Sequence, residues 1–362
     1  MKPAAKRVSK ATPQSPVLGG EVAREGQRRP VNPSAIPLSK RANVLLLEHA
    51  RVLQKDGRVL YLTKSAAEMA GRGGEDELLH RDLVRNYFNI PQHNTALLLL
   101  GTGTSITDSA ARLLADANVM VCFTGGGGAP LGLAADPMFL VPQSEYLPTE
   151  YMQAWMRMWL DEVERLRIAK AFLRERLDLS VEHWDLDKDL QRKGIRIADQ
   201  DARRFEAAIK TAESTEQLLS AEGVWAKSLD ATLARGFGIK DFTRIEQPGE
   251  WTQASPPSKI INAMISNGNY IANGYAAIAL HALGISFALP VLHGKTRRGA
   301  LVFDVADIFK DWTVMPLAFH AASASKPWSD QQFRNELIDR LQPKIIDTTI
   351  DIIKNSIAKK SQ

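Results

Sequence analysis

The sequence predicts an α+β protein in which a small N-terminal β-rich domain precedes a larger, all-α C-terminal domain. Two observations lead to this prediction. Short β-prone runs separated by turn residues fill the chain from residue 44 to residue 123. After residue 149, apolar side chains instead recur at spacings of three and four, as on one face of a helix. A change in composition at residues 142–148 separates the two patterns.

The first 34 of the 362 residues carry the positive charge of the chain. They include seven lysines and arginines and two glutamates, which gives a net charge of +5. The formal net charge of the whole chain is also +5, so the rest of the chain is neutral overall. This stretch has no aromatic residue and is rich in proline, glycine and serine, a composition typical of disorder. We expect a disordered basic tail at 1–35, a β-rich domain at 36–142, a linker at 143–148 and an α-helical domain at 149–362. A solvated extension is the favoured interpretation of the tail over a phosphate-binding arm.

The β-prone runs follow one another closely. Residues 44–47, 51–54 and 58–62 read as strands, and Asp56-Gly57 supplies the residues of a tight hairpin turn. Runs at 87–90, 96–100 and 119–123 continue the pattern. A helix is expected between the last two, beginning at Ser105 in a segment that resembles a capping box.

The helical pattern begins with large apolar side chains. One predicted helix face contains Met152, Trp155, Trp159, Val163 and Leu166. Aromatic residues at helical spacing are more often core than surface groups that stack on bases, so we assign both tryptophans to the core.

Several classes of protein are excluded or disfavoured. Cys122 is the single cysteine, which rules out an intrachain disulfide and cysteine-rich zinc sites. The glycine-rich segments at 101–105 and 294–296 lack residues required by dinucleotide and P-loop motifs, since Ile106 and Leu289 stand where glycine is needed. No secretory signal or membrane-length apolar run is present, and we expect no membrane contact and a cytoplasmic protein.

The most informative stretch runs from His293 to Trp312. If its second half is helical, Asp304 and Asp307 share one edge, where their mutual repulsion requires a cation. Lys295, Arg297 and Arg298 could supply that charge in a plain ion-pair network. The other interpretation is a divalent ion, Mg²⁺ or Mn²⁺, held by carboxylates and an imidazole. Spacing alone leaves both open.

The three basic residues bear on the substrate of such a metal. They lie between the candidate ligands in the sequence, so a phosphodiester could bridge a metal and a guanidinium there. We therefore name Lys295, Arg297 and Arg298 as candidate residues for binding a polyanionic substrate.

The sequence resembles a known family, the CRISPR-associated integrase-endonuclease of spacer acquisition. Within this family it is similar to the type I-F-like branch. Six segments carry the resemblance: Ser39-Lys-Arg-Ala-Asn43, Leu100-Gly-Thr-Gly-Thr-Ser-Ile-Thr107, Pro142-Gln-Ser-Glu-Tyr146, Gly268-Asn269-Tyr270, Val291-Leu-His-Gly-Lys-Thr-Arg-Arg298 and Val302-Phe-Asp-Val-Ala-Asp307. The resemblance implies the two-domain fold already expected, with a β domain followed by a helical one.

The resemblance also implies a catalytic site and a reaction. The family's metal ligands fall on Glu222, His293 and Asp307, with Asp304 as a further acidic catalytic group. Glu222 lies in Leu218-Leu-Ser-Ala-Glu-Gly-Val-Trp225, and without the family we would place it on a helix surface. The implied reaction is insertion of short foreign DNA fragments into a CRISPR array, by attack of a 3′-hydroxyl on a repeat phosphodiester.

Partners follow from the resemblance as well. Family members act on double-stranded and branched DNA and on CRISPR repeat DNA. They form homodimers around a small ferredoxin-like Cas partner, which in this branch is fused to a helicase-nuclease. Two other functions remain: a non-catalytic DNA-binding scaffold, in which the acidic pair is a structural ion network, and a nuclease for branched DNA that shares the same site.

Overall fold

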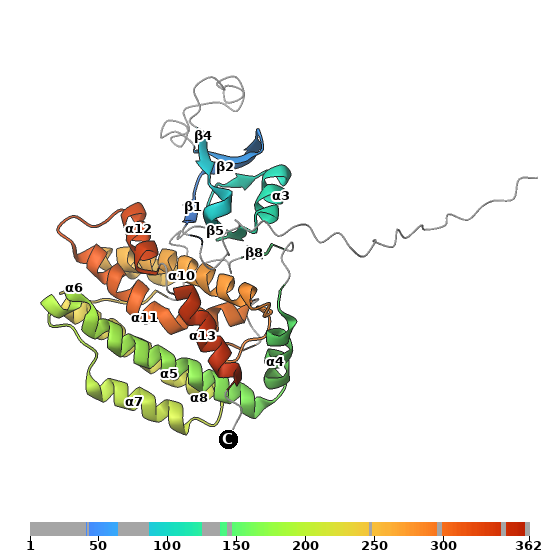
Figure 1. Ribbon diagram of the computed structural model, residues 1–362. Helices are drawn as coiled ribbons and strands as arrows, with labels where there is room; N and C mark the ends of the chain where they lie inside the picture. The colour runs from blue at the N-terminus through green and yellow to red at the C-terminus, as the bar shows by residue number, and fades with distance from the viewer. Residues whose placement is uncertain are drawn as a thin grey trace, which may run out of the picture. The chain divides into compact units, whose positions relative to one another are not determined.

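The structure is a computed structural model, and it describes residues 41, 43–63, 87–124, 138–142, 147–245, 248–294, 299–341 and 345–358 (Figure 1). All of them lie within Ile36–Gln362, which forms one compact unit. Strands come first along this unit and helices follow, which confirms the predicted fold class. The basic tail at 1–35 lies outside the described residues. The domain boundary near residue 142 stays a prediction.

The strands of the described residues form two four-stranded sheets. The first has the order β1-β5-β7-β8, with the first three strands parallel and β8 antiparallel. The second has the order β4-β3-β2-β6. The strand bounds are β1 (Asn43–Leu47), β2 (Ala50–Lys55), β3 (Arg58–Thr63), β4 (Tyr87–Ile90), β5 (Thr95–Leu100), β6 (Ser105–Ile106), β7 (Met120–Phe123) and β8 (Met138–Leu140).

The predicted hairpin is present. Strands β2 and β3 pair antiparallel from Ala50 opposite Thr63 to Lys55 opposite Arg58. Asp56 and Gly57 join them with φ values of 51° and 74°, the two positive angles that a type I′ turn needs. The aspartate tolerates this conformation and the glycine adopts it without strain, so this local sequence is sufficient to specify the turn.

Strand β5 lies between two hydrophobic cores. All six of its residues are buried, and side chains alternate between the faces of the sheet. Leu97 and Leu99 belong to the large core shared with the helices, while Leu98 and Leu100 belong to a smaller core with β2, β3 and α3 (Asp108–Asp116). The apolar run at 96–100 is thus explained by burial on both faces.

The helix after β5 begins later than predicted. Ser105 and Ile106 form β6, and α3 (Asp108–Asp116) starts behind Thr107, whose side chain accepts the N–H of Ala110. Parallel pairing of Ser105 with Arg51 extends the second sheet and uses the residues that the capping-box interpretation placed in the helix. The expected helix is therefore confirmed, with a different cap.

The rest of the described chain is helical. A short 3₁₀ turn, η2 (Gln92–Asn94), precedes β5. The helices are α4 (Thr149–Trp159), α5 (Glu162–Leu186), α6 (Lys188–Arg192), α7 (Asp199–Thr211), α8 (Thr215–Gly236), α9 (Pro248–Gln253), α10 (Pro256–Ala282), α11 (Ala300–Ser323), α12 (Asp330–Leu341) and α13 (Ile345–Ala358). None of the described helices has the length and apolar character needed to cross a membrane.

The predicted apolar face from Met152 to Leu166 is interrupted. Helix α4 ends at Trp159, and Asp161 caps α5 by accepting the N–H groups of Val163 and Glu164. The break changes the rotational phase of the pattern, so Val163 is 76% exposed instead of buried. Trp155 is fully buried, which confirms its assignment to the core.

Helices α10 and α11 run side by side at the centre of the helical region (Figure 1). Helix α11 also packs against α5 and α8, so three of the elements that carry site residues meet here. Gly274 of α10 faces the strands: a Cβ at this position would lie 2.1 Å from Cδ2 of Leu97. This glycine permits the close approach of α10 to β5.

Candidate metal centre

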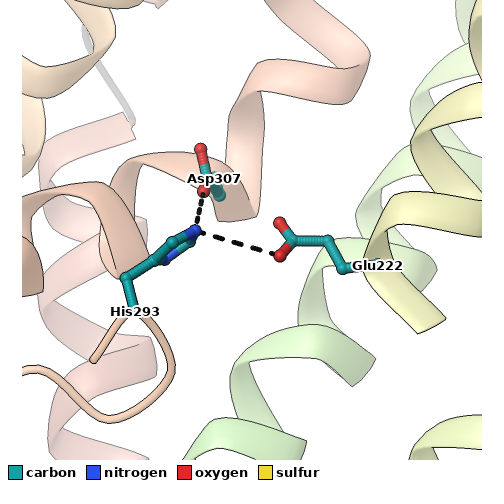
Figure 2. A group of neighbouring side chains, drawn as sticks. All are labelled: Glu222, His293 and Asp307. Atoms are coloured by element: carbon teal, nitrogen blue, oxygen red, sulfur yellow. Dashed lines mark ion pairs between the residues drawn. The ribbon is translucent and has the colours of Figure 1, made fainter. Parts of the chain in front are cut away.

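Three separate elements bring Glu222, His293 and Asp307 together (Figure 2). Glu222 comes from α8, His293 from the loop that follows α10, and Asp307 from the second turn of α11. The Nε2 atom of His293 lies 3.9 Å from Glu222 Oε2 and 3.8 Å from Asp307 Oδ2. One ligand atom from each residue falls within 4.8 Å of the other two. Among the described residues, this is the group of histidine, cysteine and acidic side chains arranged closely enough to bind one ion.

Asp304 lies behind the imidazole and organises the loop. Its Oδ1 atom accepts the backbone N–H of His293 at 2.8 Å and lies 2.7 Å from Nδ1 of the same residue. Its Oδ2 atom accepts the backbone N–H groups of Val291 at 2.6 Å and Leu292 at 3.0 Å. The Asp304 side chain is completely buried. It therefore holds the Nδ1 proton and directs Nε2 toward Glu222 and Asp307, as expected of a residue that orients a metal-binding histidine.

Two indole groups secure the same loop upstream. Trp155 Nε1 donates to the carbonyl of Leu289 at 3.1 Å, and Trp159 Nε1 donates to the carbonyl of Pro290 at 2.6 Å. Both donors come from α4, far away in sequence. The aromatic pair predicted to be core thus also anchors the segment that leads to His293.

Glu222 contacts a buried cation that the sequence reasoning did not identify. Its Oε1 atom accepts a hydrogen bond from Nη1 of Arg176 on α5, while Oε2 faces His293. Arg176 also pairs with Asp311 on α11. Positions 176, 222 and 311 are too far apart in the sequence for any local pattern to connect them.

Lys310 is a second cation that the sequence reasoning missed. Its Nζ atom lies 2.7 Å from Asp307 Oδ1, one turn along α11. The i, i+3 spacing was visible in the sequence and was a usable signal, because such pairs meet on one helix face. The pair leaves Asp307 Oδ2 on the side of the imidazole.

Charge and burial shift the titration of the three candidate ligands. Burial opposes ionisation of Asp307, but the positive charges of Lys310, Arg176 and His293 outweigh it and lower the pKa of this carboxyl to about 2. Burial raises the pKa of Glu222 above its ordinary value, although Arg176 acts in the opposite direction. Burial lowers the pKa of His293, but the hydrogen bond to Asp304 and the charges of Asp307 and Glu222 outweigh it and raise this pKa above its ordinary value. The site thus favours a positive charge at this position, either a proton on the imidazole or a metal cation.

A cavity of about 320 Å³ opens beside the three ligands. Lys227, Arg244 and Asn269 are among its other lining residues, so donors for an anionic ligand face the same space as the carboxylates. The volume is that of a small-molecule site. Lys295, Arg297 and Arg298, which the sequence suggested for DNA binding, lie outside the described residues.

Comparison with known proteins decides the family. A family model described as CRISPR associated protein Cas1 matches residues 46–340. The chain belongs to the Cas1 family. The match confirms the resemblance drawn from the sequence motifs, and it spans both the strands and the helices that carry the metal centre.

Relatives within the Cas1 family align over most of their length. The CRISPR-associated endonuclease Cas1 of Pseudomonas aeruginosa (strain UCBPP-PA14) is 41% identical over 335 residues, which cover 89% of this chain and 94% of the relative. The protein of the same name from Pectobacterium atrosepticum is 37% identical over 334 residues, covering 90% and 94%.

Two solved structures share the fold. A crystal structure of a TtCas1–DNA complex superposes with a TM-score of 0.61 at 21% identity, covering 88% of this chain and 93% of that one. A casposase bound to its integration product superposes with a TM-score of 0.65 at 16% identity, covering 88% and 91%.

Proposed function

We propose that Glu222, His293 and Asp307 bind the divalent cation at which this Cas1 protein, a CRISPR-associated endonuclease and adaptation integrase, carries out its phosphodiester chemistry. The observation that supports this most directly is the convergence of their ligand atoms within 4.8 Å from three distant elements. The identity to the two bacterial relatives fits the type I-F-like branch.

The donor set suits a hard or borderline cation. It offers two carboxylate oxygens and an imidazole nitrogen, and Cys122, the single thiol, is buried in β7. Oxygen-rich sites of this kind favour Mg²⁺ or Mn²⁺. A bound ion would supply Lewis acidity to a phosphoryl oxygen. Asp304 holds the imidazole in the tautomer that leaves Nε2 available, and Lys310 and Arg176 hold the carboxylates.

The reaction that we assign is transesterification. The 3′-hydroxyl of a short DNA fragment loses its proton and its oxygen forms a bond to phosphorus at the end of a CRISPR repeat. The bond from that phosphorus to the 3′-oxygen of the flanking nucleotide breaks, and the departing oxygen takes up a proton. One phosphodiester replaces another, so no nucleotide is consumed. We assign Lys295, Arg297 and Arg298 to the DNA backbone because they lie two to five positions after His293 in the sequence.

The remaining sequence expectations complete the proposal. We propose double-stranded and branched DNA as substrates, in keeping with the DNA complex of TtCas1 and the integration complex of the casposase. We also propose a homodimer around the small ferredoxin-like Cas partner, fused in this branch to the helicase-nuclease, and a cytoplasmic location. The two-domain division with its linker at 143–148 belongs to the same proposal.

An integration assay tests the catalytic role. We expect His293→Ala and Asp307→Ala to abolish strand transfer while DNA binding persists, and EDTA to do the same to the unaltered protein. Glu216→Gln, an exposed change on the same helix as Glu222, serves as the control and should integrate normally. Strand transfer retained in both alanine variants would instead identify the protein as a non-catalytic DNA scaffold.

Cleavage of branched DNA can be measured on the same variants. A nuclease activity that shares the metal centre should disappear together with integration in His293→Ala. Replacing Arg297 and Arg298 by neutral residues should lower integration and leave Mn²⁺ affinity unaltered. Unchanged integration in that variant would remove the assigned DNA-backbone role.

A further inference from the structure

A buried ion pair lies directly behind the metal centre. The guanidinium of Arg176 on α5 is bidentate to Asp311 on α11, with Nε 2.7 Å from Oδ2 and Nη2 2.9 Å from Oδ1. The two side chains are only 6% and 1% exposed. A pair of this kind restricts both partners strongly. If one side chain moved away, the buried charge of the other would no longer be neutralised.

Two tryptophans hold the acidic partner in place. Trp225 of α8 donates from Nε1 to Asp311 Oδ2 at 2.8 Å, and Trp184 of α5 donates to the backbone carbonyl of Asp311 at 2.9 Å. The ring of Trp225 is itself stacked on Phe205, with centroids 4.9 Å apart. Asp311 is thereby held by contacts to α5 and α8, and the orientation of the Arg176 guanidinium follows from it.

The nitrogen of Arg176 that is turned away from Asp311 contacts the metal centre. Nη1 donates to Oε1 of Glu222, and the other carboxylate oxygen, Oε2, faces His293 Nε2 at 3.9 Å. The contact from Arg176 decides which oxygen is offered to a cation.

We propose that Arg176, fixed by Asp311 and Trp225, is a positioning residue that holds Glu222 as a single-oxygen ligand through Oε2. This inference rests on the proposed metal-binding function of Glu222, His293 and Asp307. The alternative is that the Arg176–Asp311 pair only joins α5 to α11 and has no influence on the metal centre.

Mn²⁺ titration of the full chain without DNA, followed by electron paramagnetic resonance, separates these possibilities. Arg176→Lys keeps the charge but cannot span Asp311 and Glu222 at once, since an ammonium lacks the planar fork. We expect Mn²⁺ affinity to fall about tenfold, the usual effect of losing a group that orients a metal ligand. Arg167→Lys on the same helix is the matched control, because Arg167 pairs with Glu164 and the Ser356 carbonyl, and should bind Mn²⁺ normally.

A double variant shows whether Arg176 acts through Glu222. Glu222→Gln alone should weaken Mn²⁺ binding, and adding Arg176→Lys should weaken it no further, because interacting residues are not additive. Additive losses of Mn²⁺ affinity would show that Arg176 does not act through Glu222 and would overturn the proposal. Normal Mn²⁺ affinity in folded Arg176→Lys, with binding weakened in Glu222→Gln, would overturn the inference while leaving the proposed function intact. Unchanged affinity in Glu222→Gln would instead contradict the proposed function.

Trp225→Phe provides a test that does not depend on the folding of the Arg176 variant. It removes the N–H bonded to Asp311 but keeps an aromatic ring against Phe205. We expect Mn²⁺ affinity to fall about threefold, a smaller loss than for a group in direct contact with the ligand. Unchanged affinity in this variant would contradict the role given to the network.

Discussion

The two sides of the candidate metal centre are built differently. The histidine side consists of residues 289–294 and 299–307, in which Asp304 binds three successive backbone N–H groups and the ring of His293. The glutamate side consists of Glu222, Arg176 and Asp311, which come from three helices. One side is specified within a short stretch of chain, whereas the other exists only after the helices have packed. Substitutions on the two sides should therefore have different consequences.

The largest expected effect is on the glutamate side. Asp311→Asn removes the bidentate charged partner of the buried Arg176 and leaves it paired with Glu222, and we expect the free energy of unfolding to fall by about 3–5 kcal/mol. Urea denaturation followed by circular dichroism measures this loss. Asp339→Asn, an exposed change on α12, is the control and should be neutral within about 0.5 kcal/mol. A loss below about 1 kcal/mol in Asp311→Asn would show that the Arg176–Asp311 pair contributes little to the stability of the packed helices.

The corresponding change on the histidine side is Asp304→Asn. An amide has one oxygen acceptor and places its NH₂ group against donors that the carboxylate satisfied. We therefore expect the free energy of unfolding to fall by about 3 kcal/mol. Hydrogen exchange at the amides of Val291, Leu292 and His293 should accelerate, and these amides should stay protected in Asp311→Asn. Equal exchange in the two variants would contradict the separation of the two sides.

A smaller effect is expected where the tryptophans anchor the histidine side. Trp159→Phe keeps an aromatic ring and removes the donor to the Pro290 carbonyl, which costs about 1 kcal/mol in unfolding free energy. The measurement is again urea denaturation, and Mn²⁺ affinity should change less than in Arg176→Lys. A larger loss of Mn²⁺ affinity in Trp159→Phe than in Arg176→Lys would show that α4 has the greater influence on metal binding.

The smallest effect near neutral pH should be seen at Cys122, which lies on neither side. Burial raises the pKa of its thiol to about 12. The pKa of the thiol is therefore higher in the folded state than in the unfolded state. Below the ordinary thiol pKa near 9, this difference contributes to the free energy of unfolding. The contribution is lost as the pH rises from about 9 to 12. Folded protein at pH 8 should resist iodoacetamide, whereas protein in urea should react. Rapid alkylation of the folded chain would contradict this burial.

Local sequence was sufficient for much of the fold. Asp56 and Gly57 indicated a hairpin, and the apolar run at 96–100 indicated a strand that proved to be buried on both faces. Errors arose where neighbouring segments competed for the same residues. Ser105 pairs with β2 instead of capping a helix, and Asp161 begins a new helix that turns Val163 to solvent.

The sequence by itself placed His293, Asp304 and Asp307 in one short segment, with the two aspartates on one helix edge, but their spacing left a metal site and an ion-pair network both open. The family resemblance named the ligands, and it alone placed Glu222, which no local pattern indicated. Only the tertiary structure decided that Asp304 orients the imidazole and that Arg176 and Asp311 stand behind Glu222. The physical reason is that burial of these charges depends on how α5, α8 and α11 pack, and residue spacing along one helix carries no information about which other helix will supply the partner.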